Sequence, residues 1–335
     1  MADVRSLPEG LRARPVRADD IDSVVALLAA AELVDDTGEH ENADDLTLWL
    51  INDRVDLADD TRAVVTDDGE LLAYAVTVDL GTHREAFAVH LDGRVHPDAR
   101  GRGIGRALLG WQLERAGELH RSRRPDLPAR FFLPVSEAHR ALERLVTRAG
   151  MEPVQFYVHM RRPMTELPAP RTVDGVQFVP FEWSRDDEVR RAHNRSFTEH
   201  AGVAERDSYA WQTWFTGQPA FRPGYSRLAL ADGAVVAYAL VYEHEADTEA
   251  TGRREAYVGQ LGVLPNARGR GLASALLTAA LRAAADDGAD RAGLQVDTDN
   301  TTGALGLYER LGFVTHRRES VWALRLPPVA GAVES

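Results

Sequence analysis

The sequence predicts a mixed α/β fold, with helices packed on a mixed sheet in the α+β manner, built twice in tandem. A strand, a loop rich in glycine and arginine, and a helix follow one another at 260–277, and the same pattern recurs at 95–109. Two further pairs of similar segments keep the same order and nearly the same separation; they lie at 69–76 with 233–240 and at 148–151 with 310–313. A repeat of this length is a whole domain, so we infer an internal duplication.

In the first half, the elements follow from hydrophobic periodicity and turn residues. Asp19 or Asp20 can cap a first helix, Asp67-Asp68-Gly69 is a hairpin turn, and Gly150 closes the last helix. The pattern predicts strands at 12–17, 62–66, 71–78, 85–95, 131–135 and 154–160, and helices at 19–31, 44–57, 100–119 and 137–149. We therefore expect a first domain over residues 1–162.

A proline-rich linker at 163–175 separates the two domains, and the second domain spans 176–328. Its long helix ends at Gly288, and its last helix is capped by Gly312. The same signals predict helices at 186–197, 207–215, 270–288 and 301–311, and strands at 227–231, 235–244, 255–264, 292–296 and within 313–326.

The amino-acid composition of the chain excludes several classes of function. The chain has no cysteine, which excludes disulfides, cysteine nucleophiles and thiolate metal sites, and we expect no metal. All 39 basic residues are arginine, which excludes a Walker-type phosphate loop and a Schiff-base lysine. The net charge of −13 argues against a nucleic-acid partner. The N-terminus lacks the features of a secretory signal, and no apolar run could cross a bilayer, so we expect a cytoplasmic protein without a membrane partner.

The repeated loop has the composition of an anion site. Gly269 and Gly271 let the backbone turn with its N–H groups outward, at the start of a helix. Arg268 and Arg270 add positive charge that suits a phosphate. An ordinary strand-to-helix turn is the alternative, but the recurrence at Arg100 favours an anion site in both copies.

These residues resemble the GNAT superfamily of acyl-CoA-dependent N-acetyltransferases. The loops at 100–105 and 268–273 both satisfy the superfamily pattern Arg/Gln-x-x-Gly-x-Gly/Ala. The second copy also carries Asn300, followed by a helix with Tyr308 shortly before Leu-Gly-Phe313, which is a further signature of the superfamily. The resemblance covers nearly the whole chain and implies two tandem GNAT acyl-CoA N-acyltransferase domains.

The resemblance implies where coenzyme A binds. Its pyrophosphate would rest on the loop, its pantetheine arm would run beside the preceding strand, and Asn300 would bond that arm unless it is only a helix cap. The residues implied are Leu261, Gly262, Val263, Arg268, Gly269, Arg270, Gly271, Leu272, Ala273, Ser274 and Asn300, with Arg100, Gly101, Arg102, Gly103 and Gly105 in the first copy.

Tyr308 is the candidate general acid. Attack of an amine on a thioester expels a thiolate, and a tyrosine, with a usual pKa of about 10, holds its proton at neutral pH and can give it to that thiolate. A tyrosine packed in the core is the alternative reading. In the first copy the positions of Tyr308 and Asn300 are taken by Val146 and Ala138, neither of which can donate from its side chain. We expect the first domain to be catalytically impaired.

The general base is harder to assign. The position that carries an acid in related two-domain enzymes falls near Tyr257, and Glu255 has the same strand parity, so Glu255 is the prediction. Glu243, His244 and His200 are further candidates. The sequence thus predicts an acetyl-CoA-dependent N-acetyltransferase that acts on a primary amine of a small molecule or peptide by direct attack. A non-catalytic acyl-CoA-binding or scaffolding protein is the alternative.

Overall fold

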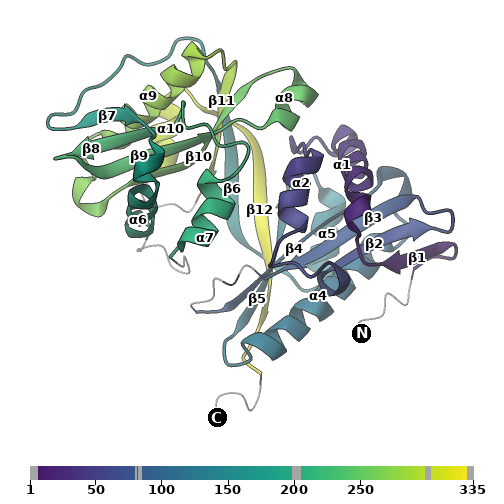
Figure 1. The fold of residues 1–335 in the computed structure, drawn as a ribbon. Helices are drawn as coiled ribbons and strands as arrows, with labels where there is room; N and C mark the ends of the chain where they lie inside the picture. The colour runs from purple at the N-terminus through teal and green to yellow at the C-terminus, as the bar shows by residue number, and fades with distance from the viewer. Residues whose placement is uncertain (1–6, 80, 82–84, 198–204, 299–302, 330–335) are drawn as a thin grey trace. The chain divides into compact units, whose positions relative to one another are not determined.

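The computed structural model describes residues 7–79, 81, 85–197, 205–298 and 303–329. The chain forms two compact units, each with helices packed on a mixed sheet, as predicted. Unit 1 comprises Met1–Phe156 with Glu319–Ser335, and unit 2 comprises Tyr157–Arg318. Each unit contains one copy of the repeated strand–loop–helix motif (Figure 1).

In unit 1, β4 and β5 run parallel and the other neighbouring strands are antiparallel. The sheet order is β1 (Leu11–Arg14), β2 (Thr61–Thr66), β3 (Leu71–Val78), β4 (Phe87–Val95), β5 (Ala129–Ser136) and the end of β12 (Val314–Leu326). The helices are α1 (Ile21–Asp35), α2 (Ala43–Leu50), α3 (Leu57–Asp60), α4 (Ile104–Arg123) and α5 (Arg140–Arg148). Alternate residues of β3 pack on α1 and α2 and on α4, so helices cover both faces.

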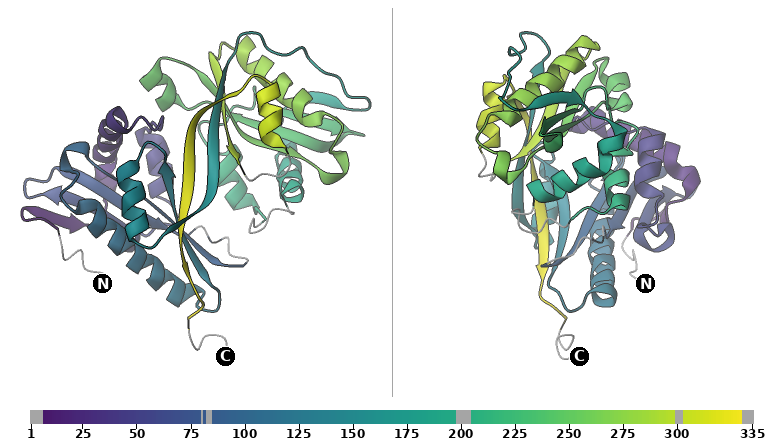
Figure 2. Two further views of the ribbon diagram at one scale, coloured as in Figure 1. Left: turned by 180° about the vertical axis from the view of Figure 1, so that it is seen from behind. Right: turned by 60° about the vertical axis from the view of Figure 1, so that its left-hand side comes forward.

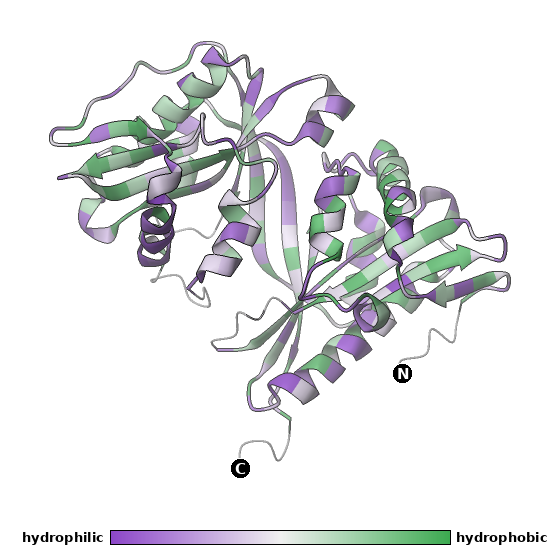
Figure 3. Cartoon of the chain, in the orientation of Figure 1, coloured by the Kyte–Doolittle hydropathy of each residue, from purple (hydrophilic) through white to green (hydrophobic). Residues whose placement is uncertain are grey.

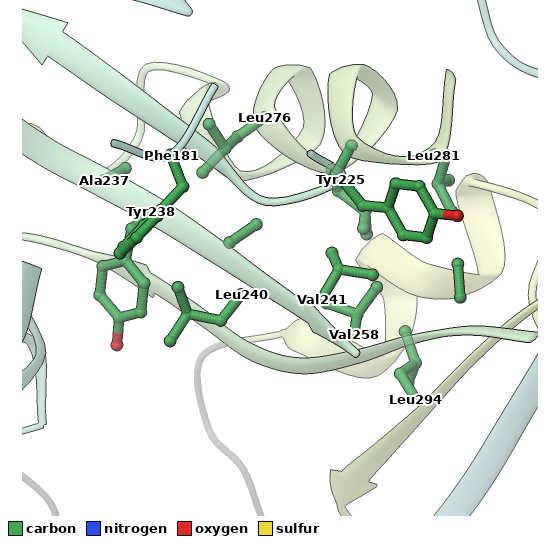
Figure 4. Close-up of a cluster of buried hydrophobic side chains, with 14 of the residues drawn as sticks. Phe181, Tyr225, Ala237, Tyr238, Leu240, Val241, Val258, Leu276, Leu281 and Leu294 are labelled. Carbon is green, nitrogen blue, oxygen red and sulfur yellow. The ribbon is translucent and has the colours of Figure 1, made fainter. Parts of the chain in front are cut away.

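In unit 2, β10 and β11 are the parallel pair. The sheet order is β6 (Glu152–Pro163), β11 (Arg291–Asp297), β10 (Glu255–Val263), β9 (Ala234–Tyr242), β8 (Arg227–Ala231) and β7 (Gln177–Pro180). The helices are α6 (Asp186–Ser196), α7 (Ser208–Trp211), α8 (Glu245–Thr251), α9 (Leu272–Asp286) and α10 (Ala304–Arg310). Figure 4 shows Leu276 of α9 on one side of β9 and the ring of Tyr238 pointing away on the other, toward α6.

The two halves of the chain exchange a strand. Residues 157–163 of β6 pair with β11, and Val158 and Met160 belong to the core of unit 2. Residues 319–326 of β12 pair with β5, and Trp322 belongs to the core of unit 1. The domain limits predicted above, 1–162 and 176–328, follow chain order, whereas the compact units follow this exchange; those limits stay a prediction.

Hydrophobic side chains concentrate in the central strands, where the alternation in the sequence predicted them (Figure 3). The strands Leu71–Val78 and Arg227–Ala231 have the predicted limits. Helix α8 was not predicted, because its sequence, Glu-Ala-Asp-Thr-Glu-Ala-Thr, has no apolar period. The predicted helix at 207–215 is a short α-helix continued by a π-helical turn at Gln212–Thr216. Within the part of the chain that the structure describes, no helix is both long and apolar enough to cross a membrane.

Candidate functional site

A cavity of about 550 Å³ opens in unit 2 where β10 ends and α9 begins. β10 pairs with β11 over residues 255–258, and among the described residues no strand pairing continues on that side along 259–263. On its other side β10 pairs with β9 as far as Val263, with a bulge between Val258 and Gln260. The cavity is lined by Pro168, Arg171, Ser196, Phe197, Leu261, Gly262, Val263, Ala267, Arg268, Gly269, Gly271, Leu272, Ala273, Ser274, Gly303, Ala304, Leu307, Tyr308, Arg310 and Leu311. The structure thus brings the predicted strand end, loop and tyrosine together.

The glycine loop has the geometry of an anion site. Gly269 and Gly271 have φ of +78° and +79°, a region that glycine enters without strain. Gly271 is the N-cap of α9 and has no side chain with which to cap the helix. Leu272, Ala273 and Ser274 of the first turn line the cavity, and no side-chain acceptor for their N–H groups is found among the described residues. Apart from its neighbours along the chain, a Cβ at Gly271 would meet no atom of the described residues within 4 Å, which leaves room for a ligand against the backbone.

The two loop arginines hold neighbouring backbone in place. Arg268 donates from Nη2 to the carbonyl of Ser196 at 3.0 Å, which ties the end of α6 to the loop. Arg270 donates from Nη2 to the carbonyl of Asp174 at 2.8 Å. Among the described residues that line the cavity there are three arginines and no carboxylate. An anionic ligand is therefore favoured there despite the acidic balance of the whole chain.

Tyr308 lies on α10 with 9% of its surface exposed, against Phe313. Burial raises the pKa of its hydroxyl to about 12, so the group keeps its proton at neutral pH. No hydrogen-bond partner of this hydroxyl is found among the described residues. A tyrosine that keeps its proton thus lines the same cavity as Leu261 and the glycine loop. Asn300, predicted to bind the same ligand, lies outside the described residues.

Glu255 does not reach this cavity. It lies at the start of β10, six residues before Leu261, which is about 20 Å along a strand. Its side chain is 9% exposed and forms ion pairs with Arg161 at 2.8 Å and Arg291 at 2.5 Å. Glu243 is likewise paired, with Arg254 at 3.1 Å. His200 lies outside the described residues.

One buried pair was missed by the sequence reasoning. The Nδ1 atom of His193 on α6 lies 2.8 Å from the hydroxyl of Tyr238 on β9, and both residues are buried. Burial, with the nearby charge of Arg206, lowers the pKa of His193 to about 4, so the neutral ring accepts the tyrosine proton. A Cβ at Gly262 would come within 2.3 Å of the Tyr238 ring, so this pair directly supports the cavity-lining end of β10.

Unit 1 has a corresponding cavity of about 420 Å³, lined in part by Arg100, Gly101, Gly103 and Gly105. Arg102 is exposed and is not part of the lining. Here the first loop arginine binds a buried acid: both terminal nitrogens of Arg100 lie 2.6 Å from the carboxylate of Asp35.

Val146 in this unit is fully buried and, as a valine, offers no proton. Unit 1 therefore has the loop and the cavity, with a valine at the position that the sequence comparison aligns with Tyr308.

Comparison with known proteins agrees with these features. Residues 27–133 and 187–313 match the family described as "Acetyltransferase (GNAT) family". The chain is 33% identical to the mycothiol acetyltransferase of Frankia casuarinae, over 90% of this chain and 94% of that protein.

Two solved structures share the fold. A GCN5-related N-acetyltransferase from Sphaerobacter thermophilus superposes with a TM-score of 0.77 at 24% identity, over 98% of this chain and 100% of that one. A tandem GNAT protein from the clavulanic acid biosynthesis pathway superposes with a TM-score of 0.67 at 21% identity, over 94% of this chain and 98% of that one. The tandem arrangement is thus shared with a protein of known structure.

Proposed function

Because this chain belongs to the acetyltransferase (GNAT) family and is an acetyl-CoA-dependent N-acetyltransferase, we propose that unit 2 performs the transfer, with Tyr308 as its proton donor. The observation that supports this assignment is that Tyr308, whose hydroxyl keeps its proton at neutral pH, lines the same cavity as the glycine loop.

In the proposed reaction, N–H groups at the start of α9 hold the pyrophosphate of acetyl-CoA. Its arm lies beside Leu261, Gly262 and Val263, so that the thioester enters between β10 and α10. The amine nitrogen bonds to the acetyl carbon, the carbon–sulfur bond breaks, and the sulfur takes the proton of Tyr308. The nitrogen loses a proton to a base as the amide forms, and solvent returns a proton to the tyrosine, so that the step balances. The loop residues Arg268 to Ser274, with Asn300 beyond the described residues, complete the proposed coenzyme site.

A general base has to take the proton of the attacking amine, and Glu255, predicted from the sequence, is the candidate to test. If Glu255 takes that proton, Glu255→Gln abolishes turnover while the fold persists. If its role is to pair with Arg161 and Arg291, the same change lowers the melting temperature, because two guanidinium groups lose their partner. Its separation from the cavity supports the second outcome. Steady-state rates together with a melting curve distinguish the two.

Unit 1 is proposed to bind coenzyme A without catalysis. Its loop, Arg100 to Gly105, and its cavity support binding, and Val146 in place of a tyrosine supports the lack of turnover.

The acceptor is a small-molecule amine, and we propose the unacetylated precursor of mycothiol as the first one to test. The support is the name and the nearly full-length match of the relative from Frankia casuarinae. One residue argues against this acceptor. Tyr257 stands near the position where related two-domain enzymes are expected to carry an acidic residue.

Thiol release from acetyl-CoA with the purified chain tests the proposal, across that precursor and a panel of primary amines. Rapid release with the precursor supports a mycothiol synthase-like reaction. Release only with other amines supports a different acceptor, and no release above the buffer rate with any amine would contradict catalysis.

A further inference from the structure

The segment that joins the two halves of the sequence is fastened to unit 2 along α9. We call residues 164–175 the strap. Arg282 of α9 donates to the carbonyl of Pro168 at 2.7 and 3.0 Å, and Arg270 of the glycine loop donates to the carbonyl of Asp174 at 2.8 Å. Met164, Leu167 and Val173 pack against the core of unit 2. The strap therefore belongs to the wall of unit 2, as its course past α9 in Figure 2 shows.

Arg171 stands midway between these two anchors, three residues after Pro168 and three before Asp174. Arg171 is exposed and lines the cavity. Among the described residues, no hydrogen-bond or ion-pair partner of its guanidinium is found. Pro168 and Pro170 stiffen the approach to it. Fixed ends and a short span restrict where this charge can go, so it is held at the outer edge of the cavity.

The parts of coenzyme A divide between the inside and the outside of this cavity. The pyrophosphate is accounted for by the N–H groups at the start of α9, and the arm runs inward toward Tyr308. The remaining charged group is the phosphate on the 3′ position of the ribose, which carries between one and two negative charges at neutral pH, as phosphate monoesters do. In coenzyme A this phosphate is attached on the far side of the pyrophosphate from the arm. The exposed arginines of the lining are Arg171, Arg268 and Arg310, and Arg268 already donates to the carbonyl of Ser196.

We propose that Arg171 binds the 3′-phosphate of coenzyme A, so that the strap selects coenzyme A over its 3′-dephospho form. The planar guanidinium donates two hydrogen bonds to one phosphate, which suits this role. Arg310 on α10 is also exposed and also lines this cavity, so it is a second positive charge available there. This inference rests on the proposed coenzyme site in unit 2 and adds to it a specificity that comes from outside the glycine loop.

Calorimetric titration of the full chain with coenzyme A and with 3′-dephospho-coenzyme A tests the proposal. The parent should bind coenzyme A more tightly than the dephospho form. Arg171→Gln should weaken coenzyme A by roughly tenfold, the scale of one charge-assisted contact, and change the dephospho form less than twofold. Arg253→Gln, an exposed arginine of unit 2 outside the cavity, is the matched control and should change neither. Binding in unit 1 serves as an internal reference, because Arg171 does not line that cavity.

An equal loss for both ligands in Arg171→Gln, or no loss for either, would overturn the role of Arg171. Parent chain that binds neither ligand in unit 2 would instead overturn the proposed coenzyme site itself. Melting curves of the variant identify a loss of fold. In that event Arg171→Lys, which keeps the charge, should restore both stability and the preference for coenzyme A if the proposal holds.

Discussion

At the scale of single residues, Tyr308 owes its chemistry to its surroundings. A tyrosine on an exposed helix would begin to lose its proton near pH 10, whereas burial on α10 raises the pKa of this one to about 12. The hydroxyl therefore stays a donor through the physiological range. The same burial makes the packing of the ring matter to stability, so a test has to separate the hydroxyl from the ring.

Tyr308→Phe keeps the ring and removes the proton donor. Turnover should fall by roughly a hundredfold or more, while the Michaelis constant for acetyl-CoA changes little, because the contact matters mainly in the transition state. Stability should change by about 1 kcal/mol at most. In the parent, ionisation of Tyr308 should cause no alkaline loss of activity below about pH 10, since its raised pKa keeps it protonated there. Near-normal turnover in the folded variant would show that Tyr308 only fills space.

His193 should make unit 2 sensitive to acid. Its pKa is about 4 in the folded chain against 6.5 in the unfolded chain, so between these values the unfolded state binds a proton that the folded state does not. Stability therefore falls as the pH drops from 6.5 to 4, by about 3 kcal/mol from this residue. His193→Gln keeps a hydrogen-bond acceptor for the Tyr238 hydroxyl and removes the pH-dependent contribution of the imidazole to stability. Urea unfolding at pH 7 and pH 4.5 should show a smaller acid loss in the variant than in the parent; equal losses would refute the assignment.

At the scale of elements, the junction of β10, the glycine loop and α9 fixes the site. Two features favour glycine at position 271. Its φ of +79° strains any other residue, and the space that a Cβ would occupy, free of described protein atoms beyond the chain neighbours, is the space proposed for the coenzyme. The crowding that a larger residue causes should thus be felt by the coenzyme.

Gly271→Val should weaken coenzyme binding in unit 2, through backbone strain and through contact with the pyrophosphate. The matching change, Gly103→Val, at a φ of +90° in unit 1, should leave turnover largely intact. Comparing the turnover of the two variants separates the units. Loss of activity in Gly103→Val alone would mean that unit 1 is the catalytic one.

The sequence was informative where a site is built from neighbours along the chain. The residues from Leu261 to Ser274 form one continuous motif, and Tyr308 sits in a second, so both could be found by pattern. The pair of His193 and Tyr238 joins a helix to a distant strand, and no local pattern records it. For Glu255, the prediction used strand parity, and parity does not say how far along a strand a side chain lies.

At the scale of the whole chain, the exchange of β6 and β12 could not be predicted. Both strands carry the same kind of alternating pattern, so either could close either sheet, and only the contacts of Met160 and Trp322 reveal the choice.

Removing residues 319–335 should therefore damage unit 1, although they lie at the end of the second half. β5 would lose its partner strand, and the core would lose Trp322, a cost of about 3 to 5 kcal/mol for a large aromatic residue. Hydrogen exchange should show faster exchange of the β5 amides and little change in β8 and β9. Unchanged protection of β5 would contradict the strand pairing described here.

The position of residues 319–326 in unit 1 also bears on how the chain is made. During synthesis an N-terminal domain usually folds before the rest has left the ribosome. Here the first sheet receives its last strand only from residues 319–326, which are translated after all of unit 2. Until then β5 has an open edge, the kind of surface that pairs with other chains. The newborn chain is thus expected to depend on chaperones until residues 319–326 have left the exit tunnel.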